Sequence, residues 1–74
     1  MRTQAEVEEL FRRLYRDMGN EPAQLIQVKP MDGGWENALS YEVTRADKKK
    51  TRVYRRDLDD GNEEAIKAAL RSFA

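Results

Sequence analysis

Basic side chains grouped around one aromatic residue are the part of this chain best suited to chemistry. Within residues 45–56 the basic members are Arg45, Lys48, Lys49, Lys50, Arg52, Arg55 and Arg56. Tyr54 stands among them, and Asp47 is the only acid in the same stretch. Basic side chains beside an exposed ring can bind a phosphate backbone and stack a base. The same pattern is also typical of a hairpin whose charges keep its tip in water and block edge-to-edge aggregation.

An acidic group follows the basic one directly. Its members are Asp57, Asp59, Asp60, Glu63 and Glu64. A calcium loop is excluded by spacing, because placing Gly61 at position six puts Arg56 at position one, where the loop needs Asp. Asp60 and Glu63 have the spacing of a helix capping box, and acids favour the N-terminal end of a helix. We therefore predict a helix start here, with magnesium binding by these carboxylates as the open alternative.

The residues that most other catalytic mechanisms need are missing from this sequence. The chain has no cysteine and no histidine, so thiolate chemistry, the usual transition-metal ligands and the usual neutral-pH acid-base group are missing. Gly33 and Gly34 lack the further glycine and the lysine of a phosphate-binding loop. A chain of 74 residues also leaves little volume for a substrate pocket of about 300 Å3. We expect a protein that is not an enzyme and that uses no cofactor, no metal and no small-molecule substrate.

Length and overall charge set further bounds. The 74 residues predict a single domain, 1–74. The 14 basic and 14 acidic residues balance, so no overall field steers the chain toward an anionic polymer. No apolar run approaches the ~18 residues of a membrane-spanning helix, and the N-terminus lacks the apolar region of a secretory signal. We expect a cytoplasmic location and no membrane partner.

The basic group lies on a predicted β-hairpin. Apolar residues occupy alternate positions at Trp35, Leu39, Tyr41 and Val43, which predicts a strand over 35–46 with these side chains on its buried face. A second strand is predicted over 50–58, with Val53 and Tyr54 at its centre. Pairing Val43 with Val53, and so Glu42 with Tyr54, brings the apolar side chains to one face. That register leaves residues 47–49 as a three-residue loop, with residue 49 in the left-handed conformation.

The segments before the hairpin form a helix and a strand. Thr3 and Glu6 make a capping box ahead of a helix predicted over 4–18. The apolar stripe of that helix is Val7, Leu10, Phe11, Leu14 and Met18. A short strand is predicted over 23–29, and Pro30 should end it because proline cannot donate a hydrogen bond to a sheet. Residues 31–34 then form a turn.

A second helix closes the chain at about residue 72. Its apolar stripe is Ile66, Ala69, Leu70 and Phe73. The predicted fold class is α+β, with the order α-β-β-β-α. Its three-stranded sheet is an antiparallel meander, and both helices pack on one face because only that face is apolar.

This layout is similar to that of the double-stranded RNA-binding domain. The order of elements, the loop after the first strand and the alanine-rich helix at residues 64–70 are shared over nearly the whole chain. In that family a lysine-rich segment at the start of the second helix grips phosphates. Here the matching positions are Asn62, Glu63 and Glu64, and the loop at 31–34 has no histidine. The resemblance therefore implies the fold, and it argues against that family's usual mode of RNA binding.

The sheet should keep one face uncovered, and that face should carry Gln27, Lys29, Glu42, Thr44, Arg52, Tyr54 and Arg56. The residues expected to contact a partner are Lys29, Arg45, Lys48, Lys49, Lys50, Arg52, Tyr54 and Arg56. The leading hypothesis is a small interaction or regulatory module that binds another protein, or a second copy of itself, without catalysis. Separated basic and acidic patches would orient such a partner. The alternative is a nucleic-acid-binding protein that uses the basic hairpin.

Overall fold

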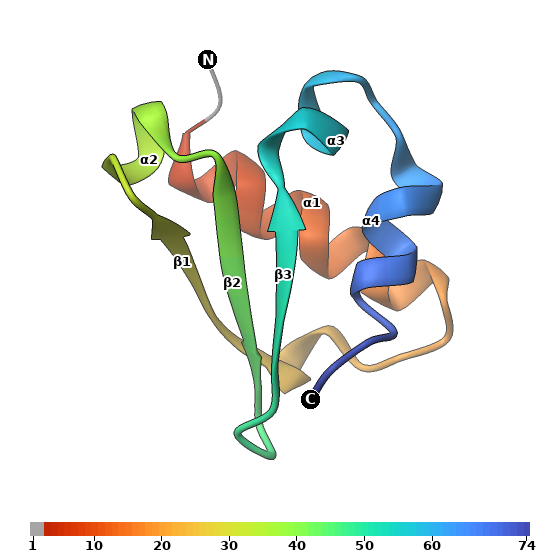
Figure 1. Cartoon of the computed structure of the whole chain (residues 1–74). Helices are drawn as coiled ribbons and strands as arrows, with labels where there is room; N and C mark the ends of the chain where they lie inside the picture. Colours follow the sequence, from red (N-terminus) through yellow and green to blue (C-terminus); the bar gives the residue numbers. More distant parts are fainter. Residues whose placement is uncertain (1–2) are drawn as a thin grey trace.

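Residues 3–74 are described in a computed structural model. The elements in chain order are α1 (Gln4–Asp17), a short 3-10 turn η1 (Pro22–Gln24), β1 (Leu25–Met31), α2 (Gly34–Asn37), β2 (Ser40–Arg45), β3 (Lys50–Tyr54), α3 (Arg55–Asp59) and α4 (Glu63–Ala69). The strands form one antiparallel sheet in the order β1-β2-β3 (Figure 1). The predicted α+β class and the three-stranded meander are confirmed.

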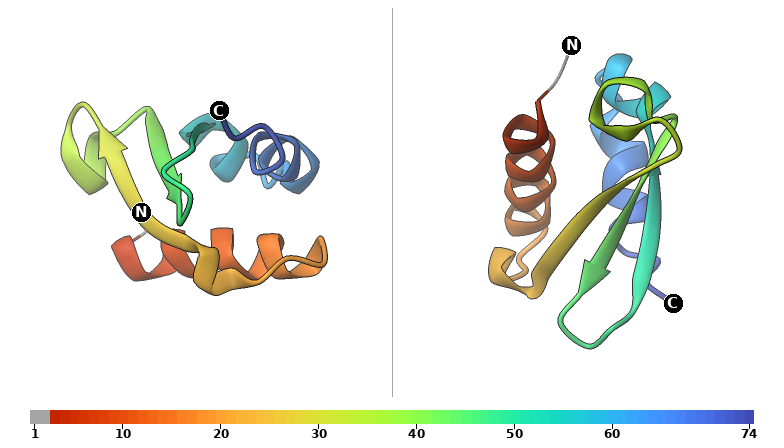
Figure 2. Two further views of the ribbon diagram at one scale, coloured as in Figure 1. Left: turned by 90° about the horizontal axis from the view of Figure 1, so that it is seen from below. Right: turned by 90° about the vertical axis from the view of Figure 1, so that its left-hand side faces the viewer.

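The two longer helices and the sheet share one core. α1 crosses the sheet on one side, and α4 lies beside β3 (Figure 2). The buried members include Val7, Phe11 and Leu14 of α1, Val28, Tyr41, Val43 and Val53 of the sheet, and Ile66 and Leu70 of α4. Each such side chain stabilises the fold by about 1.5–3 kcal/mol relative to its exposed state. The apolar sides of both helices thus pack into one core, as the sequence predicts.

The first helix forms where its capping residues predict. The Thr3 hydroxyl accepts from the Glu6 N–H at 3.3 Å, and a Glu6 carboxylate oxygen accepts from the Thr3 N–H at 3.0 Å. The helix ends at Asp17, and Gly19 follows with a φ of +88°. Left-handed glycine after a helix is a common stop. The helix predicted over 4–18 is therefore confirmed to within one residue.

Pro30 lies inside β1, so the prediction that it ends the first strand is wrong. The Arg45 N–H donates to the Lys49 carbonyl and the Arg55 N–H donates to the Leu39 carbonyl, which directs the backbone groups of odd-numbered β2 residues toward β3. The backbone groups of even-numbered β2 residues therefore point toward β1 and form the hydrogen bonds with it. Pro30 pairs with an odd-numbered residue, so its missing N–H would point outward from the edge of the sheet. Proline is tolerated at such an edge position.

A helical turn replaces the beginning of the predicted strand over 35–46. Asp32 has a φ of +54° and Gly33 a φ of +90°, and they lead the chain into α2. Trp35 still reaches the core, because its ring stacks on Tyr41 with 5.7 Å between centroids. Leu39 does not, since it is 75% exposed. The period of two cannot carry through a helical turn, so the inward placement predicted for Leu39 is wrong.

The hairpin pairs two residues away from the predicted register. Val43 lies opposite Thr51 rather than Val53. The faces are unchanged, since only an odd shift exchanges them. The loop is residues 46–48, with Lys48 at a φ of +72° and its N–H donating to the Arg45 carbonyl at 2.9 Å. The three-residue loop type is confirmed, but it begins one residue earlier, because Asp47 accepts from the Lys49 N–H at 3.1 Å.

The last part of the chain also departs from prediction. The strand predicted over 50–58 ends at Tyr54, and α3 follows it directly. The cap of α4 is Asn62, whose side chain accepts from the Ala65 N–H at 3.2 Å, and Asp60 is instead the C-terminal cap of α3. α4 stops at Ala69, short of residue 72. Beyond it, Ala74 and Lys50 exchange two backbone hydrogen bonds of 3.0 Å, which covers part of the outer edge of β3.

Candidate docking face of the sheet

The side of the sheet away from the core carries three cross-strand rows of side chains. The rows are Gln27–Thr44–Lys50, Lys29–Glu42–Arg52 and Met31–Ser40–Tyr54. Paired residues of neighbouring strands point to the same side, and the residues between them face the core. We call these nine residues the open face. α1 lies on the other side of the sheet (Figure 2), and no helix among residues 3–74 covers the open face.

Positive charge dominates the open face. Lys29, Lys50 and Arg52 are exposed, and the one carboxylate is Glu42. The Lys50 Nζ lies 3.7 Å from a Glu42 carboxylate oxygen. Within residues 3–74, Lys29 and Arg52 make no ion pair. An exposed pair such as that of Lys50 contributes at most about 1 kcal/mol, so the fold gains little from this arrangement.

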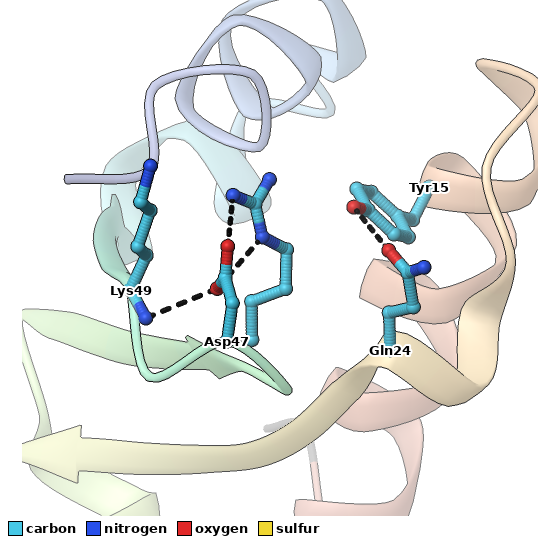
Figure 3. Close-up of polar contacts among 5 residues, drawn as sticks. Tyr15, Gln24, Asp47 and Lys49 are labelled. Carbon is cyan, nitrogen blue, oxygen red and sulfur yellow. Dashed lines mark hydrogen bonds and ion pairs between the residues drawn. The ribbon is translucent and has the colours of Figure 1, made fainter.

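Arg45 is held on the core side of the sheet. Its Nε donates to one oxygen of Asp47 at 3.0 Å and its Nη2 donates to the other at 2.6 Å. The guanidinium also lies 4.7 Å from the ring centroid of Phe73, a cation–π contact. Figure 3 shows the hydrogen bonds that converge on Asp47. Arg45 is thus engaged in structural contacts and lies apart from Lys29 and Arg52.

The same contacts shift the ionisation of the pair. The hydrogen bonds from the Arg45 guanidinium lower the pKa of Asp47 to about 2, and the hydrogen bond from the Lys49 N–H acts in the same direction. The pKa of Arg45 is raised by the same carboxylate. Asp47 is therefore a carboxylate throughout the neutral range. Lys48 and Lys49 remain exposed beside it at the hairpin tip, next to the Lys50 end of the open face.

The opposite end of the open face is apolar. Tyr54 is 49% exposed, and Leu39 is 75% exposed where β2 begins. Both line a hollow of about 540 Å3 whose other lining residues are Arg55, Arg56, Asp59 and Asp60. Arg56 therefore lies on α3, at this hollow and outside the three rows. Sequence reasoning missed the contribution of Leu39, although the glycine pair at 33–34 could have signalled a break in the strand.

Metal-binding geometry is absent from the part of the chain that the structure describes. Among residues 3–74 no group of three or more histidine, cysteine, aspartate or glutamate side chains could hold a metal ion. In the same residues no helix is long and apolar enough to cross a bilayer. Two of the acids after β3 form ion pairs within or between helices: Asp59 pairs with Arg55 at 3.4 Å within α3, and Glu63 of α4 pairs with Arg13 of α1 at 2.7 Å.

Comparisons with family models, with curated proteins and with solved structures give no match for this chain. The similarity to the double-stranded RNA-binding domain therefore stays a prediction. Of the residues that this resemblance matches to the family's lysine-rich segment, Asn62 caps α4 and Glu63 and Glu64 lie in its first turn. The function has to be inferred from the surface of this chain.

Proposed function

We propose that this chain is a small, non-catalytic interaction module that binds an acidic protein segment across its open face and hairpin tip. The observation that carries the proposal is the uncovered sheet face with three cations and one carboxylate. Lys29 and Arg52 have no acidic partner in residues 3–74, so an incoming carboxylate displaces no existing pair. A cytoplasmic location belongs to the same proposal.

The layout of charge supports an oriented partner. The hairpin tip with Lys48 and Lys49 lies at one end of the sheet, and α3 lies at the other, where Asp60, Glu63 and Glu64 follow its balanced charges (Figure 1). Such separation steers a charged partner into one orientation and makes the association rate depend on salt. Head-to-tail pairing of two copies would use the same two ends, and it is the form that self-association would take.

Nucleic-acid binding is the second candidate, and one observation favours it. Tyr54 is half exposed, and Arg52 projects from the same face two residues before it. A base could stack on the ring while Arg52 and Lys50 contact phosphates. Two features weigh against it, since Arg45 is occupied by Asp47 and the formal net charge is zero. We therefore place the acidic protein segment first.

A charge-reversal experiment tests the proposal. The variant Lys29→Glu/Arg52→Glu changes the open face, and Arg16→Glu/Arg71→Glu makes the same change of net charge at exposed sites on α1 and after α4. The probes are a labelled glutamate-rich peptide and a labelled mixed-sequence RNA, each titrated at low and moderate salt by fluorescence anisotropy. We expect the open-face variant to bind the peptide at least about tenfold more weakly than the wild type, and the control to bind as the wild type does.

Two results would overturn the assignment. One is a wild type that fails to bind the peptide at low salt, and the other is equal binding by both variants. RNA binding that exceeds peptide binding and falls steeply with salt would establish the nucleic-acid function instead. Thermal unfolding of both variants shows whether each is folded when it is titrated.

A further inference from the structure

Leu39 is held on the surface by the backbone around it. Its carbonyl accepts from the Arg55 N–H at 2.9 Å, which joins the beginning of β2 to the end of β3. Ala38, just before it, is fully buried and fills the inward position. Leu39 must then turn outward, and it is the most exposed of the large apolar side chains in residues 3–74. A leucine fixed in water at an ordered position is a candidate contact residue.

The hollow beside Leu39 has an apolar wall and a charged rim. Leu39 and Tyr54 supply the wall. On the rim, Arg55 is already engaged, since its Nε lies 3.4 Å from Asp59 and its Nη1 donates to the Glu36 carbonyl at 3.1 Å. Arg56 makes no ion pair or side-chain hydrogen bond within residues 3–74. The hollow can therefore take an apolar side chain, and its rim leaves one cation, Arg56, and one acid, Asp60, without an ion pair in residues 3–74.

The hollow continues into the cations of the open face. Tyr54, Arg52 and Lys50 are alternate residues of β3 and point to the same side of the sheet. Two residues of a strand span about 7 Å, so Arg52 and Lys50 stand about 7 and 14 Å from the apolar end. An extended peptide lying along β3 has the same rise and the same alternation of side chains.

We propose that this hollow receives one apolar side chain, the anchor, of an extended acidic segment. The second and fourth residues of the segment, counted from the anchor, are acids that contact Arg52 and Lys50 respectively. The inference rests on the proposed function and adds to it the anchor and its spacing. Charge complementarity and the continuity of the hollow with the open face select this occupant. A second copy does not supply it, because in residues 3–74 acids at alternate positions occur only within the helices α1 and α3.

Peptides of equal length and equal charge test the anchor and the spacing. The anchored peptide carries leucine followed by glutamates at the second and fourth positions, with serine between them, and is made in both chain directions. One control replaces the leucine by serine, and another moves the glutamates to the first and third positions. We expect one direction of the anchored peptide to bind the wild type at least about tenfold more tightly than either control.

Two protein variants test the hollow. Leu39→Ser removes the aliphatic part of its apolar wall, and Ile26→Ser removes the other exposed large aliphatic side chain of residues 3–74, which is 48% exposed at a bulge in β1. We expect Leu39→Ser to abolish the advantage of the anchored peptide and Ile26→Ser to preserve it. Neither should prevent folding, since Leu39 is 75% exposed and Ile26 is 48% exposed, and thermal unfolding checks this.

The outcomes separate the two proposals. If glutamate peptides bind the wild type but neither the leucine, the spacing nor Leu39→Ser changes their affinity, the anchor is wrong and the open face remains the binding surface. If no glutamate peptide binds the wild type at low salt, the proposed function fails, and the anchor fails with it.

Discussion

At the scale of single residues, Asp47 determines the shape of the hairpin tip. Its carboxylate accepts from the Arg45 guanidinium and from the Lys49 N–H, and so it joins the two sides of the loop. These bonds are charge-assisted, and so strongest, while Asp47 is ionised. Its pKa, about 2, lies below the ordinary aspartate value of ~3.9. The pair therefore contributes stability above pH ~4, and the contribution is lost as the pH falls through about 2.

Asp47→Asn should make this pH dependence disappear. We expect the variant to unfold at a lower temperature than the wild type at pH 7, and the difference to shrink as the pH approaches 2. The measurement is the midpoint of thermal unfolding at several pH values between 2 and 7. Asp32→Asn, at an exposed position that also tolerates asparagine, is the matched control. A gap between Asp47→Asn and the wild type that stays constant down to pH 2 would contradict the assignment.

The residues of the candidate site were predictable where strand alternation applies. Lys29, Arg52 and Tyr54 project from the face that alternation indicates, because neither a register shift of two nor the extension of β1 changes it. The contacts of Arg45 and the outward position of Leu39 were not predictable in this way. Arg45 turns toward Phe73, which follows α4, and Leu39 follows a helical turn, so both depend on segments outside the hairpin.

At the scale of elements, α1 and the three strands could be read from the sequence, and α2 and α3 could not. α1 has fourteen residues, a capping box and a full apolar stripe. α2 and α3 have four and five residues, too few to show a helical period. Both follow the end of a strand, where the chain has to turn. Such short helices form because the core takes Trp35 and Leu58, and not because of local propensity.

The two glycines at the start of α2 provide a test of this element. A Cβ on Gly33 would lie 2.9 Å from the Asn37 Cβ, whereas a Cβ on Gly34 would meet nothing within 4 Å. Both glycines have positive φ, so each alanine variant carries backbone strain of about 1–2 kcal/mol. We expect Gly33→Ala to be the more destabilising by at least about 1 kcal/mol, because it must also displace α2. Urea unfolding measures the difference, and equal losses would show that the close approach to Asn37 is not maintained in solution.

At the scale of the whole molecule, a basic and an acidic cluster occupy different parts of the surface, which the net charge alone does not reveal. The formal charge is zero, yet five of the 14 basic residues lie on the open face and hairpin tip (Lys29, Lys48, Lys49, Lys50 and Arg52), and five of the 14 acids lie in residues 57–64. One core under the other face of the sheet joins every main element, and of the nine open-face residues only Ser40 and Thr44 are buried. A single core of this kind also implies that the molecule unfolds as one unit.

The variant Leu14→Ala tests whether the molecule unfolds as one unit. Leu14 lies in α1, is fully buried and belongs to the shared core, so its truncation should cost about 2–5 kcal/mol. That is a large share of the about 4–11 kcal/mol expected for a chain of 74 residues. The fluorescence of Trp35, the only tryptophan, reports the sheet, and far-ultraviolet circular dichroism reports the helices. We expect both signals to shift together to the same lower urea midpoint, because α1 and the sheet share their apolar contacts.

Leu39→Ala, at a 75% exposed position, is the control and should change stability by no more than about 0.5 kcal/mol. Transitions that separate in Leu14→Ala would show that the sheet holds together without α1.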